Sequence, residues 1–573
     1  MLPGGVTTEF VDDWVAQGLF TTDKILERFP TRRNKYNINT KRVEASFNSV
    51  AIEDETGTKH IDERGFIKLL TISNALPKHL MDLGPIVFQS VQYLSIYPFR
   101  HEPPAALTLS ELTRGLLWLM PYDKGVIFKS WGGGWCEFSP ADHRRLIFQS
   151  LATERDGYKL PYDADEWRRE ARRRAYELPD DKIKSTLPEL GDPNYDDWGD
   201  ELYHDLLSVV MTAQPKRNLP LAGEPRDAFR PLASRLHGHE PPRLYEFTIP
   251  APRMRDFVRL MLYHTFGVSE SASLMDTCEL DQVADCVTRT FVQNSDVGIN
   301  WPMFDEGCRA AVRELLEIGN LCLIKTEETD VTMQPFLLDA LHDVMSSFWT
   351  GPSRLEGGVL ECMRHPGKLF KPPILAQLNT IFKDDQILWF ECFKYFWLHD
   401  NQHHLASISE LVATIEGSED RLLILVSGRD TRTQEHYLLG IFIPFPSRDG
   451  HRIQPKQEKD WTICSLFQLS PVQSVFEGSL ECPAWTLSGE EISFGDPENG
   501  VALVLKKGLS QASFTQSVKG PNEPIYKPAP WRGGFSIDLE MDGIEICYED
   551  SSISTEETTD SDRKDCGSET MEY

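Results

Sequence analysis

The stretch "EEISFGDPENGVALVLKKGL", residues 490–509, places an acidic, glycine-bracketed turn between two apolar runs. A phosphate-binding loop would need glycines that direct several backbone N–H groups toward a ligand at a helix N-terminus. Here a second strand-like run follows the turn, and Asp496 and Glu498 would repel a phosphate. The run "VALVL" is apolar at every position, as is typical of a strand covered on both faces. The stretch therefore predicts two strands joined by a turn.

Similar short runs continue through the C-terminal part of the chain, separated by turn residues. They are "RLLILVSG", "YLLGIFIPF", "ICSLFQL", "FSIDL" and "IEICY". The last two runs, separated by Asp542-Gly543, each place their apolar residues on one face. This spacing predicts an antiparallel β-sandwich with flanking helices over residues 372–549. Residues 550–573 are acidic and rich in Ser and Thr, which predicts a disordered tail.

The part of the chain before residue 372 has a different pattern. Residues 1–150 and 246–371 show helical periodicity, as in "LTLSELTRGLLWLMP", whereas residues 151–245 are charged and rich in proline, which predicts a linker. The predicted fold class is therefore α+β, with an N-terminal helical region followed by the C-terminal sandwich.

Composition excludes several classes of function. The chain has 573 residues, a formal net charge of −29 and 11 cysteines with no C-x-x-C pair. This acidity argues against binding nucleic acid, which requires clustered Lys and Arg. The scattered cysteines favour a reducing compartment. The N-terminal residues resemble neither a signal peptide nor a myristoylation site, and no apolar run approaches the ~20 residues that span a bilayer, so we expect a cytoplasmic protein.

One helical segment has the pattern of a calcium-binding helix–loop–helix. Aligning Ile61 with the apolar eighth position of such a loop places Asp54 at the first position and Phe66 in the following helix. The turn glycine and the bidentate glutamate are both missing, so the segment resembles an EF-hand that keeps the helix pairing without the ion. The same five-residue spacing recurs at Ile299 and Phe304. We expect both segments to serve packing and to bind no metal.

Candidate enzyme sites are weak. Cys136 follows three glycines, with His143 seven residues later, but nothing nearby would orient the pair. A second cluster consists of His399, Asp400, His403 and His404. The chain contains no H-E-x-x-H and no G-x-S-x-G. We therefore expect no catalytic residue, no metal and no cofactor. A cysteine- or metal-dependent enzyme and a calcium-regulated module remain as alternatives.

The order of motifs from about residue 372 to 549 resembles the TLDc domain of the oxidation-resistance and restriction-of-telomere-capping proteins. A helix and a strand ending in tryptophan are followed by a polar loop and a serine-containing helix, seen in "ILAQLNTIFKDDQILWFECFKYFWLHDNQHHLASISELVATI". An aromatic-glycine strand, an "SFGG"-type turn and a terminal "IEVW"-type strand then follow. The motif residues are Gly440, Phe442, Phe467, Ser493, Phe494, Gly495, Ile544 and Glu545.

The resemblance implies a β-sandwich flanked by helices, preceded by degenerate EF-hand-like helices, with no established catalytic residue. It also implies a role in resistance to oxidative stress and binding to the vacuolar-type proton ATPase, peripherally at the vacuolar membrane. Physically, Gly440 and Gly495 would allow a close backbone approach or a positive φ. Glu545 lies between two inward-facing residues and should point to the opposite face, either as a solvated edge residue or as a partner contact.

Overall fold

The computed structural model describes residues 8–33, 40–72, 76–99, 103–119, 140–154, 201–215, 225–237, 247–264, 277–293, 298–312, 368–382, 396–398, 407–417, 422–443, 464–478, 485–506, 508–520 and 522–549. The chain divides into two compact units. The first comprises Met1–Ala272 and Phe291–Ser353, and the second comprises Ser273–Thr290 and Arg354–Tyr573. None of the described helices is long and apolar enough to cross a membrane.

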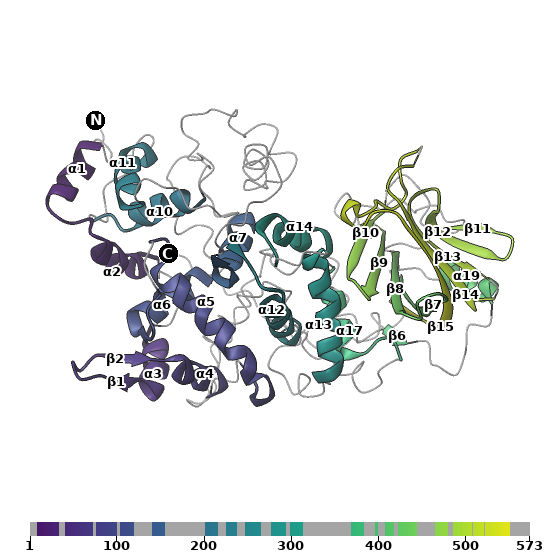
Figure 1. Cartoon of the computed structure of the whole chain (residues 1–573), viewed down its shortest axis with the longest axis horizontal. Coiled ribbons are helices and arrows are strands. Elements are labelled where there is room, and N and C mark those ends of the chain that lie inside the picture. The colour runs from purple at the N-terminus through teal and green to yellow at the C-terminus, as the bar shows by residue number, and fades with distance from the viewer. Residues whose placement is uncertain are drawn as a thin grey trace, which may run out of the picture. The chain divides into compact units, whose positions relative to one another are not determined.

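The described part of the first unit is mainly helical (Figure 1). Its principal helices are α1 (Thr8–Ala16), α2 (Thr22–Arg33), α3 (Thr40–Val50), α4 (Glu63–Ile72), α5 (Gly84–Ile96), α6 (Leu109–Leu119), α7 (Pro140–Leu151), α10 (Glu201–Thr212), α11 (Pro225–His237), α12 (Ala251–His264) and α14 (Trp301–Ala311). A 3₁₀ helix, η1 (Lys78–Leu83), precedes α5. Each helix buries an apolar stripe, as expected for helices whose stability comes from packing.

Very short strands join pairs of these helices. β2 (Lys59–Ile61) pairs with β1 (Ile52–Glu53) on one side and with β3 (Leu107–Thr108) on the other. β4 (Thr153–Glu154) pairs with β5 (Phe247–Thr248). β2 and β3 lie directly before α4 and α6, so their pairing fixes two helix N-termini side by side. β1 and β4 instead follow the C-terminal ends of α3 and α7.

Part of the region that composition marked as a linker is helical. α10 and α11 lie within residues 151–245 and pack against each other, and their side chains Leu206 and Phe229 are fully buried. α11 keeps Pro231 inside the helix, on the exposed side. The proline and charge content therefore obscured two amphipathic helices.

The second unit contains a single antiparallel sheet. Its described strands are β6 (Phe396–Leu398), β7 (Leu422–Asp430), β8 (His436–Ile443), β9 (Ser465–Ser470), β10 (Ser474–Glu477), β11 (Thr486–Ser488), β12 (Glu491–Asp496), β13 (Asn499–Lys506), β14 (Gln511–Ser517) and β15 (Phe535–Glu549). The strand order is β10-β9-β8-β7-β15-β14-β13-β12-β11, and β6 pairs with β15 (Figure 1). The prediction of antiparallel strands is confirmed.

The strand β15 connects the two halves of this sheet. Its first residues pair with β14, and the residues from Leu539 onward pair with β7. The register shifts between Met541 and Gly543, which marks a β-bulge. Asp542-Gly543 therefore lies within one continuous strand, although the sequence read as two separate runs at this point. β15 pairs with β14 in one half and with β7 in the other, so the described strands form one continuous hydrogen-bonded sheet. A sandwich of two separate sheets would have two independent hydrogen-bond networks.

Alternate residues of both halves enclose a common core. Ile424 of β7, Ile441 of β8, Leu503 of β13 and Phe514 of β14 belong to the same buried cluster. "VALVL" is buried at all its positions, 501–505, as predicted. The helix α19 (Ile408–Gly417) adds Leu411 and two further apolar residues to this core.

Two further helices are bonded to the β9–β10 part of this unit. α17 (Pro372–Asn379) is anchored by Gln377, whose Nε2 donates to the Leu469 carbonyl oxygen at 2.8 Å. α13 (Thr277–Val292) contributes its residues up to Thr290 to this unit. The Thr290 hydroxyl donates to the Gln473 carbonyl oxygen at 2.7 Å, and the Gln473 N–H donates to the Cys286 carbonyl oxygen at 3.1 Å.

Candidate functional site

Several of the sequence-predicted motif residues form a single row across the sheet. Glu545 of β15 lies opposite Leu425 of β7, Leu425 lies opposite Gly440 of β8, and Gly440 lies opposite Phe467 of β9. The row therefore crosses four neighbouring strands on the outward face. Leu425 completes it and was not singled out from the sequence, although the alternation of "RLLILVSG" places Leu425 on this face.

Aromatic rings pack at one end of this row. A Cβ added to Gly440 would meet the Phe467 ring at 2.1 Å, so only glycine allows the ring to lie over the backbone there. The ring of Phe382, which follows α17, lies 5.1 Å from Phe442 and 5.7 Å from Phe467, edge-on to both. Phe442 and Phe467 thus hold the α17 segment on the sheet.

At the other end of the row, Glu545 binds the segment that precedes α17. Its carboxylate accepts the backbone N–H groups of Lys368, Leu369 and Phe370 at 2.6, 3.0 and 3.1 Å. The residue is 9% exposed. Three charge-assisted hydrogen bonds compensate for removing the carboxylate from water.

Glu545 has the orientation expected from the alternation, and of the two alternatives for its surroundings, that of a solvated edge residue is wrong. Ile544 packs against the core cluster and Ile546 belongs to it, so Glu545 does point to the opposite face. That face is covered here by residues 368–370. This segment lies 175–177 residues away in the sequence, and no local pattern links it to β15.

The remaining motif residues lie at the end of β12, directly before the turn to β13, and the register shifts between Phe494 and Asp496 as in a β-bulge. Gly495 has φ +93°, and a Cβ at this position would lie 2.2 Å from the Val501 carbonyl oxygen. The Ser493 hydroxyl donates to the Gly495 carbonyl oxygen at 2.7 Å, and Phe494 is fully buried in the core. The predicted strand–turn–strand is confirmed. Both expectations for Gly495, a positive φ and a close approach, are met, and Gly440 meets the second.

The acidic side chain of this turn is bound within the turn. Asp496 accepts the Glu498 N–H at 2.9 Å through Oδ1 and the Asn499 side-chain amide at 2.7 Å through Oδ2. These are the bonds of a tight Asx-type turn.

The EF-hand-like segment at residues 40–72 contains a small hairpin. Asp54 Oδ1 accepts the N–H groups of Thr56 and Thr58 at 2.8 and 3.0 Å, and also the Thr56 hydroxyl at 2.6 Å. These hydrogen bonds, led by the Thr56 hydroxyl, lower the pKa of Asp54. The carboxylate oxygen expected at the first loop position is therefore occupied by the loop itself. Ile61 and Phe66 are buried, as expected for residues that serve packing.

The two EF-hand-like segments each pair with a different partner. Ile61 lies opposite Leu107, whereas Ile299 and Ile249 exchange backbone hydrogen bonds of 2.8 and 2.9 Å. Phe304 packs on Phe291, 5.7 Å between ring centroids. The partners Leu107 and Ile249 are themselves followed, five residues later, by a buried apolar side chain, and this spacing could have revealed them in the sequence.

Those matching pairs are Leu107 with Leu112 and Ile249 with Met254.

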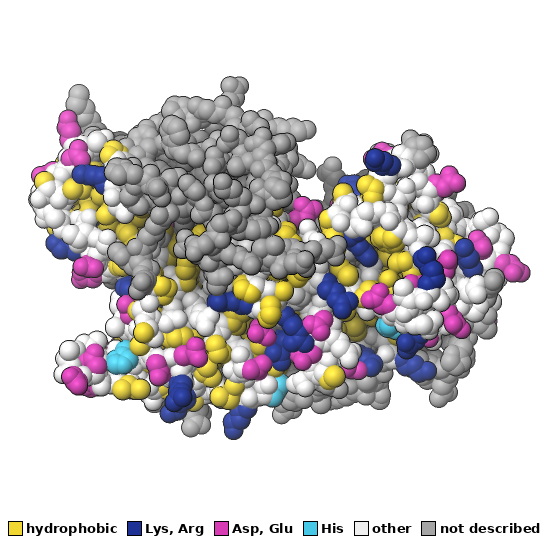
Figure 2. Space-filling view, viewed as in Figure 1, with side chains coloured by type: hydrophobic (Ala, Val, Ile, Leu, Met, Phe, Trp, Pro, Cys, Tyr) yellow, Lys and Arg dark blue, Asp and Glu magenta, His cyan; other side chains and the backbone are white. Residues whose placement is uncertain are grey.

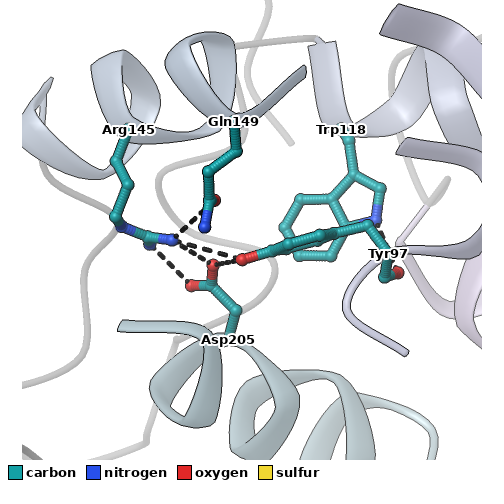
Figure 3. A network of polar contacts seen from close by, with 5 residues as sticks. All are labelled: Tyr97, Trp118, Arg145, Gln149 and Asp205. Carbon is teal, nitrogen blue, oxygen red and sulfur yellow. Dashed lines mark hydrogen bonds and ion pairs between the residues drawn. The ribbon is translucent and has the colours of Figure 1, made fainter. Parts of the chain in front are cut away.

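A buried polar network links α5, α7 and α10 in the first unit (Figure 3). Arg145 Nη1 and Nη2 donate to the two carboxylate oxygens of Asp205 at 2.7 and 3.0 Å, and the Tyr97 hydroxyl donates to the same carboxylate. Arg145 Nη1 also lies 3.3 Å from Gln149 Oε1, and the indole N–H of Trp118 donates to the Tyr97 carbonyl oxygen at 3.2 Å. Burial, with the adjacent Asp205 charge, raises the pKa of Tyr97. Its hydroxyl therefore remains a hydrogen-bond donor.

The enzyme candidates from the sequence lie outside the described residues. They are Cys136, His399, Asp400, His403 and His404, together with the side chain of His143. Among the residues that the structure does describe, no group of three or more His, Cys, Asp or Glu side chains is arranged to hold a metal ion. On the face drawn in Figure 2, Lys and Arg side chains are interspersed with Asp and Glu over the described surface.

A family model supports the resemblance seen in the motifs. Residues 363–543 match the model of the TLDc domain, and this range contains the sheet from β6 through most of β15 together with α17 and α19. Residues 363–543 are a TLDc domain. All of the aromatic, glycine and serine motif residues described above lie within this TLDc domain, whereas Ile544 and Glu545 follow directly after the matched range.

The similarity to known proteins extends beyond the TLDc domain. The chain is 25% identical over 480 residues to restriction of telomere capping protein 5 of Pyricularia oryzae, covering 74% of this chain and 67% of that protein. The Aspergillus fumigatus protein of the same name is 22% identical, covering 78% of this chain and 70% of its own length. The Emericella nidulans protein is 20% identical, with coverage of 86% and 72%. The chain is thus distantly homologous to these fungal proteins over most of its length.

Proposed function

We propose that this chain is a non-enzymatic protein that acts by binding other proteins through its TLDc domain. The partner we propose is the vacuolar-type proton ATPase, whose assembly the chain would regulate from the cytoplasmic face of the vacuolar membrane. The resulting physiological role would be resistance to oxidative stress. The observation that carries the proposal is the match of residues 363–543 to the TLDc domain, since TLDc proteins are the family that this resemblance connects with the pump.

The packing of the motif residues is consistent with this role. Gly440 and Phe467 bring strands and a helix together, and Gly495 forms the bulge of β12 that precedes the β12–β13 turn. Glu545 binds backbone N–H groups of residues 368–370. These motif residues maintain a rigid shape, and the partner would contact other side chains presented on it.

For the first unit, we propose a scaffold derived from paired EF-hand units. The support is the repeated arrangement in which an apolar strand residue pairs with its counterpart, Ile61 with Leu107 and Ile249 with Ile299. In paired EF-hands the loops contact each other in this way. Glu111, three residues after Thr108, accepts the Thr108 N–H and hydroxyl, each at 2.8 Å, as a capping box and not as an ion ligand.

The experiment that tests the main proposal is affinity capture with the full chain. The tagged chain is incubated with detergent-solubilised vacuolar membranes, and the captured proteins are identified by mass spectrometry. We expect subunits of the proton ATPase to be enriched over a tag-only capture. Recovery of no pump subunit would contradict the proposed partner.

Two glycine variants show whether the TLDc domain makes the contact. Gly495→Val should disrupt this domain, because the position has φ +93° and a side chain would collide with the Val501 carbonyl oxygen. Gly543→Ala is the matched control, since a Cβ there meets no atom within 4 Å. Capture should persist with Gly543→Ala and be lost with Gly495→Val. Equal capture by both variants would assign the contact to another part of the chain.

A further inference from the structure

A guanidinium group lies at one end of the core of the TLDc domain. Arg532 ends the short 3₁₀ helix η7 (Pro530–Arg532), and its Nη1 donates to Gln468 Oε1 at 2.7 Å and to Ser474 Oγ at 3.2 Å. Its Cζ atom lies 4.8 Å from the ring centroid of Phe535 and 5.9 Å from that of Trp531. Both distances are within the range of cation–π contacts.

The side chains around Arg532 occupy the next inward-facing position beyond a core residue on each of four strands. Gln468 follows the core residue Leu466 by two positions, and Ser474 precedes the core residue Phe476 by two. Gln516 and Tyr437 stand in the same relation to Phe514 and Leu439.

Because neighbouring strands are antiparallel, all these positions fall at the same end of the core. The apolar core of the sheet therefore ends in a layer of polar side chains around the guanidinium.

This polar layer is held in place by further hydrogen bonds. Gln516, 3% exposed, accepts the Ala529 N–H at 3.0 Å and donates to the carbonyl oxygens of Ala529 and Gly533 at 3.0 and 2.5 Å. These bonds fix the turn that carries Arg532. Gln468 is fully buried and Ser474 is 2% exposed. The site is thus preformed, which limits the ordering required when a ligand binds.

The charge of Arg532 has no carboxylate partner among the described residues. Two fully buried guanidinium groups do have one: Arg144 lies 2.9 Å from Asp305, and Arg145 lies 2.7 Å from Asp205. The buried Arg114 is bonded instead to the Ser95 carbonyl oxygen and the Ser110 hydroxyl. Burial lowers the pKa of Arg532 to about 10. Arg532 is partly buried, and removing a cation from water without a counter-charge is unfavourable.

The edge of the guanidinium that carries Nε and Nη2 is available to a ligand. Nη1 makes the two bonds described above, while Nε and Nη2 donate to no atom of the described residues. Nε and Nη2 present two parallel N–H groups, which is the geometry that binds a carboxylate or a phosphate through two oxygens. The Arg532 side chain is partly accessible to solvent, so a ligand can reach it.

We propose that Arg532, supported by Gln468, Ser474 and Gln516, is a binding site for an oxyanion at this end of the TLDc domain. The ligand group is a carboxylate or a phosphate that takes two hydrogen bonds from Nε and Nη2. Two sources fit this chemistry: a free small anion, and an acidic side chain presented by a protein partner. The site does not depend on the identity of the partner proposed above.

The alternative is that Arg532 only closes the end of the core. In that case its stability contribution would come from the bonds to Gln468 and Ser474 and from the aromatic rings, and it would not respond to anions. The two explanations differ in their dependence on anion concentration, because a ligand that binds the folded state stabilises it in proportion to its occupancy.

The test measures binding of two probes to the full chain by isothermal titration calorimetry and by thermal unfolding, at constant ionic strength. The probes are inorganic phosphate and a penta-glutamate peptide. We expect at least one probe to bind and to raise the melting temperature. Phosphate alone would indicate a small anion, and the peptide alone would indicate an acidic protein segment. Binding of neither probe would overturn the proposal.

Three variants make the test specific. Arg532→Met should weaken binding by about tenfold or more, the equivalent of at least one charge-assisted hydrogen bond. Arg532→Lys keeps the charge without the two parallel N–H groups, and it should also bind more weakly than the wild type. Arg432→Met is the matched control: Arg432 is on a neighbouring turn, 68% exposed and 4.0 Å from Asp430.

Arg432→Met should bind within about twofold of the wild type, since it leaves the site intact. It also corrects for the general stabilisation that phosphate gives to folded proteins. Equal binding by the wild type and Arg532→Lys, or equal weakening by Arg432→Met, would overturn the proposal. If Arg532→Met fails to fold, the lysine variant decides.

Discussion

Two carboxylate side chains on the same strand, Glu545 and Glu540, have very different surroundings. Glu545 is held by three backbone N–H groups from residues 368–370, whereas Glu540 on the same strand is exposed. A buried carboxylate of this kind stabilises the fold only while its oxygens accept these hydrogen bonds. The local sequence of β15 indicates the face on which each residue lies but not what covers it.

We predict that Glu545→Gln lowers the free energy of unfolding by about 2 kcal/mol, because the neutral amide replaces charge-assisted bonds with weaker ones and points a donor at the N–H groups. Chemical denaturation of the full chain measures the change. Glu540→Gln, the matched control, should remain within about 0.5 kcal/mol of the wild type. A loss of the same size in both variants would show that the hydrogen bonds from residues 368–370 to Glu545 have no special role.

His436 provides a pH-dependent contribution. Its Nε2 lies 3.0 Å from the Ser427 hydroxyl. Although the residue as a whole is exposed, partial burial of its ring lowers its pKa below 6.5, opposed by Asp542 and assisted by Arg429. The unfolded chain therefore binds a proton on this histidine more readily than the folded chain does. The stabilising contribution is present above pH 6.5 and is lost as the pH falls through the folded-state pKa.

We predict that the wild type loses more stability between about pH 7.5 and pH 5.5 than His436→Gln does, since this window spans the ordinary histidine pKa. Denaturant midpoints of both proteins at the two pH values measure the difference. Parallel losses in the two proteins would assign the pH dependence to other groups.

At the scale of helices and strands, local sequence patterns predicted where strands lie along the chain better than which strands pair with each other. The runs that predicted strands are strands, and the predicted turn follows Gly495, which has a positive φ. The alternation did not show that Asp542-Gly543 is a bulge within β15, because a bulge and a turn use the same residues. Ile61 pairs with Leu107, 46 residues later, and strand alternation does not link the two segments; the signal they share is the five-residue spacing to a buried apolar side chain.

The link between α7 and α10 also depends on distant residues, 60 positions apart in the sequence. We predict that Asp205→Ala lowers the free energy of unfolding by about 3–5 kcal/mol, because it leaves the buried Arg145 without its counter-charge. The double variant Arg145→Met/Asp205→Ala should lose less stability than the sum of the losses in Arg145→Met and Asp205→Ala, as measured in a double-mutant cycle.

The exposed pair Arg235–Asp12, 3.6 Å apart, is the control for this prediction. Asp12→Ala should change the free energy of unfolding by no more than about 1 kcal/mol, since exposed ion pairs contribute little. Strict additivity of the Arg145 and Asp205 substitutions would mean that the two side chains are not energetically coupled.

At the scale of the whole molecule, the chain combines a helical unit with a TLDc domain, and its net charge is −29. An acidic chain with paired helix–loop–helix segments could suggest a calcium-binding protein. The described loop at residues 54–65 argues otherwise, because Asp54 already accepts bonds from Thr56 and Thr58 and Gly65 occupies the position of the bidentate glutamate.

We predict that calcium at ~1 mM, the weak end of the range for such loops, leaves the melting temperature of the full chain unchanged relative to a chelator. Differential scanning calorimetry with magnesium at the same concentration controls for ionic strength. A clear rise that is specific to calcium would contradict the prediction and favour a calcium-regulated module.

The sequence by itself determined the local structure: which runs form strands or helices, where Gly440 and Gly495 are required, and the order of motifs that marks the TLDc domain. These features depend on neighbours in the chain, through side-chain alternation and backbone conformation. The tertiary structure alone decided the contacts of Glu545 with residues 368–370, of Arg145 with Asp205, and of Arg532 with Gln468. The physical reason is that a charged side chain's environment is set by the distant segments that cover it, and local sequence patterns do not specify those segments.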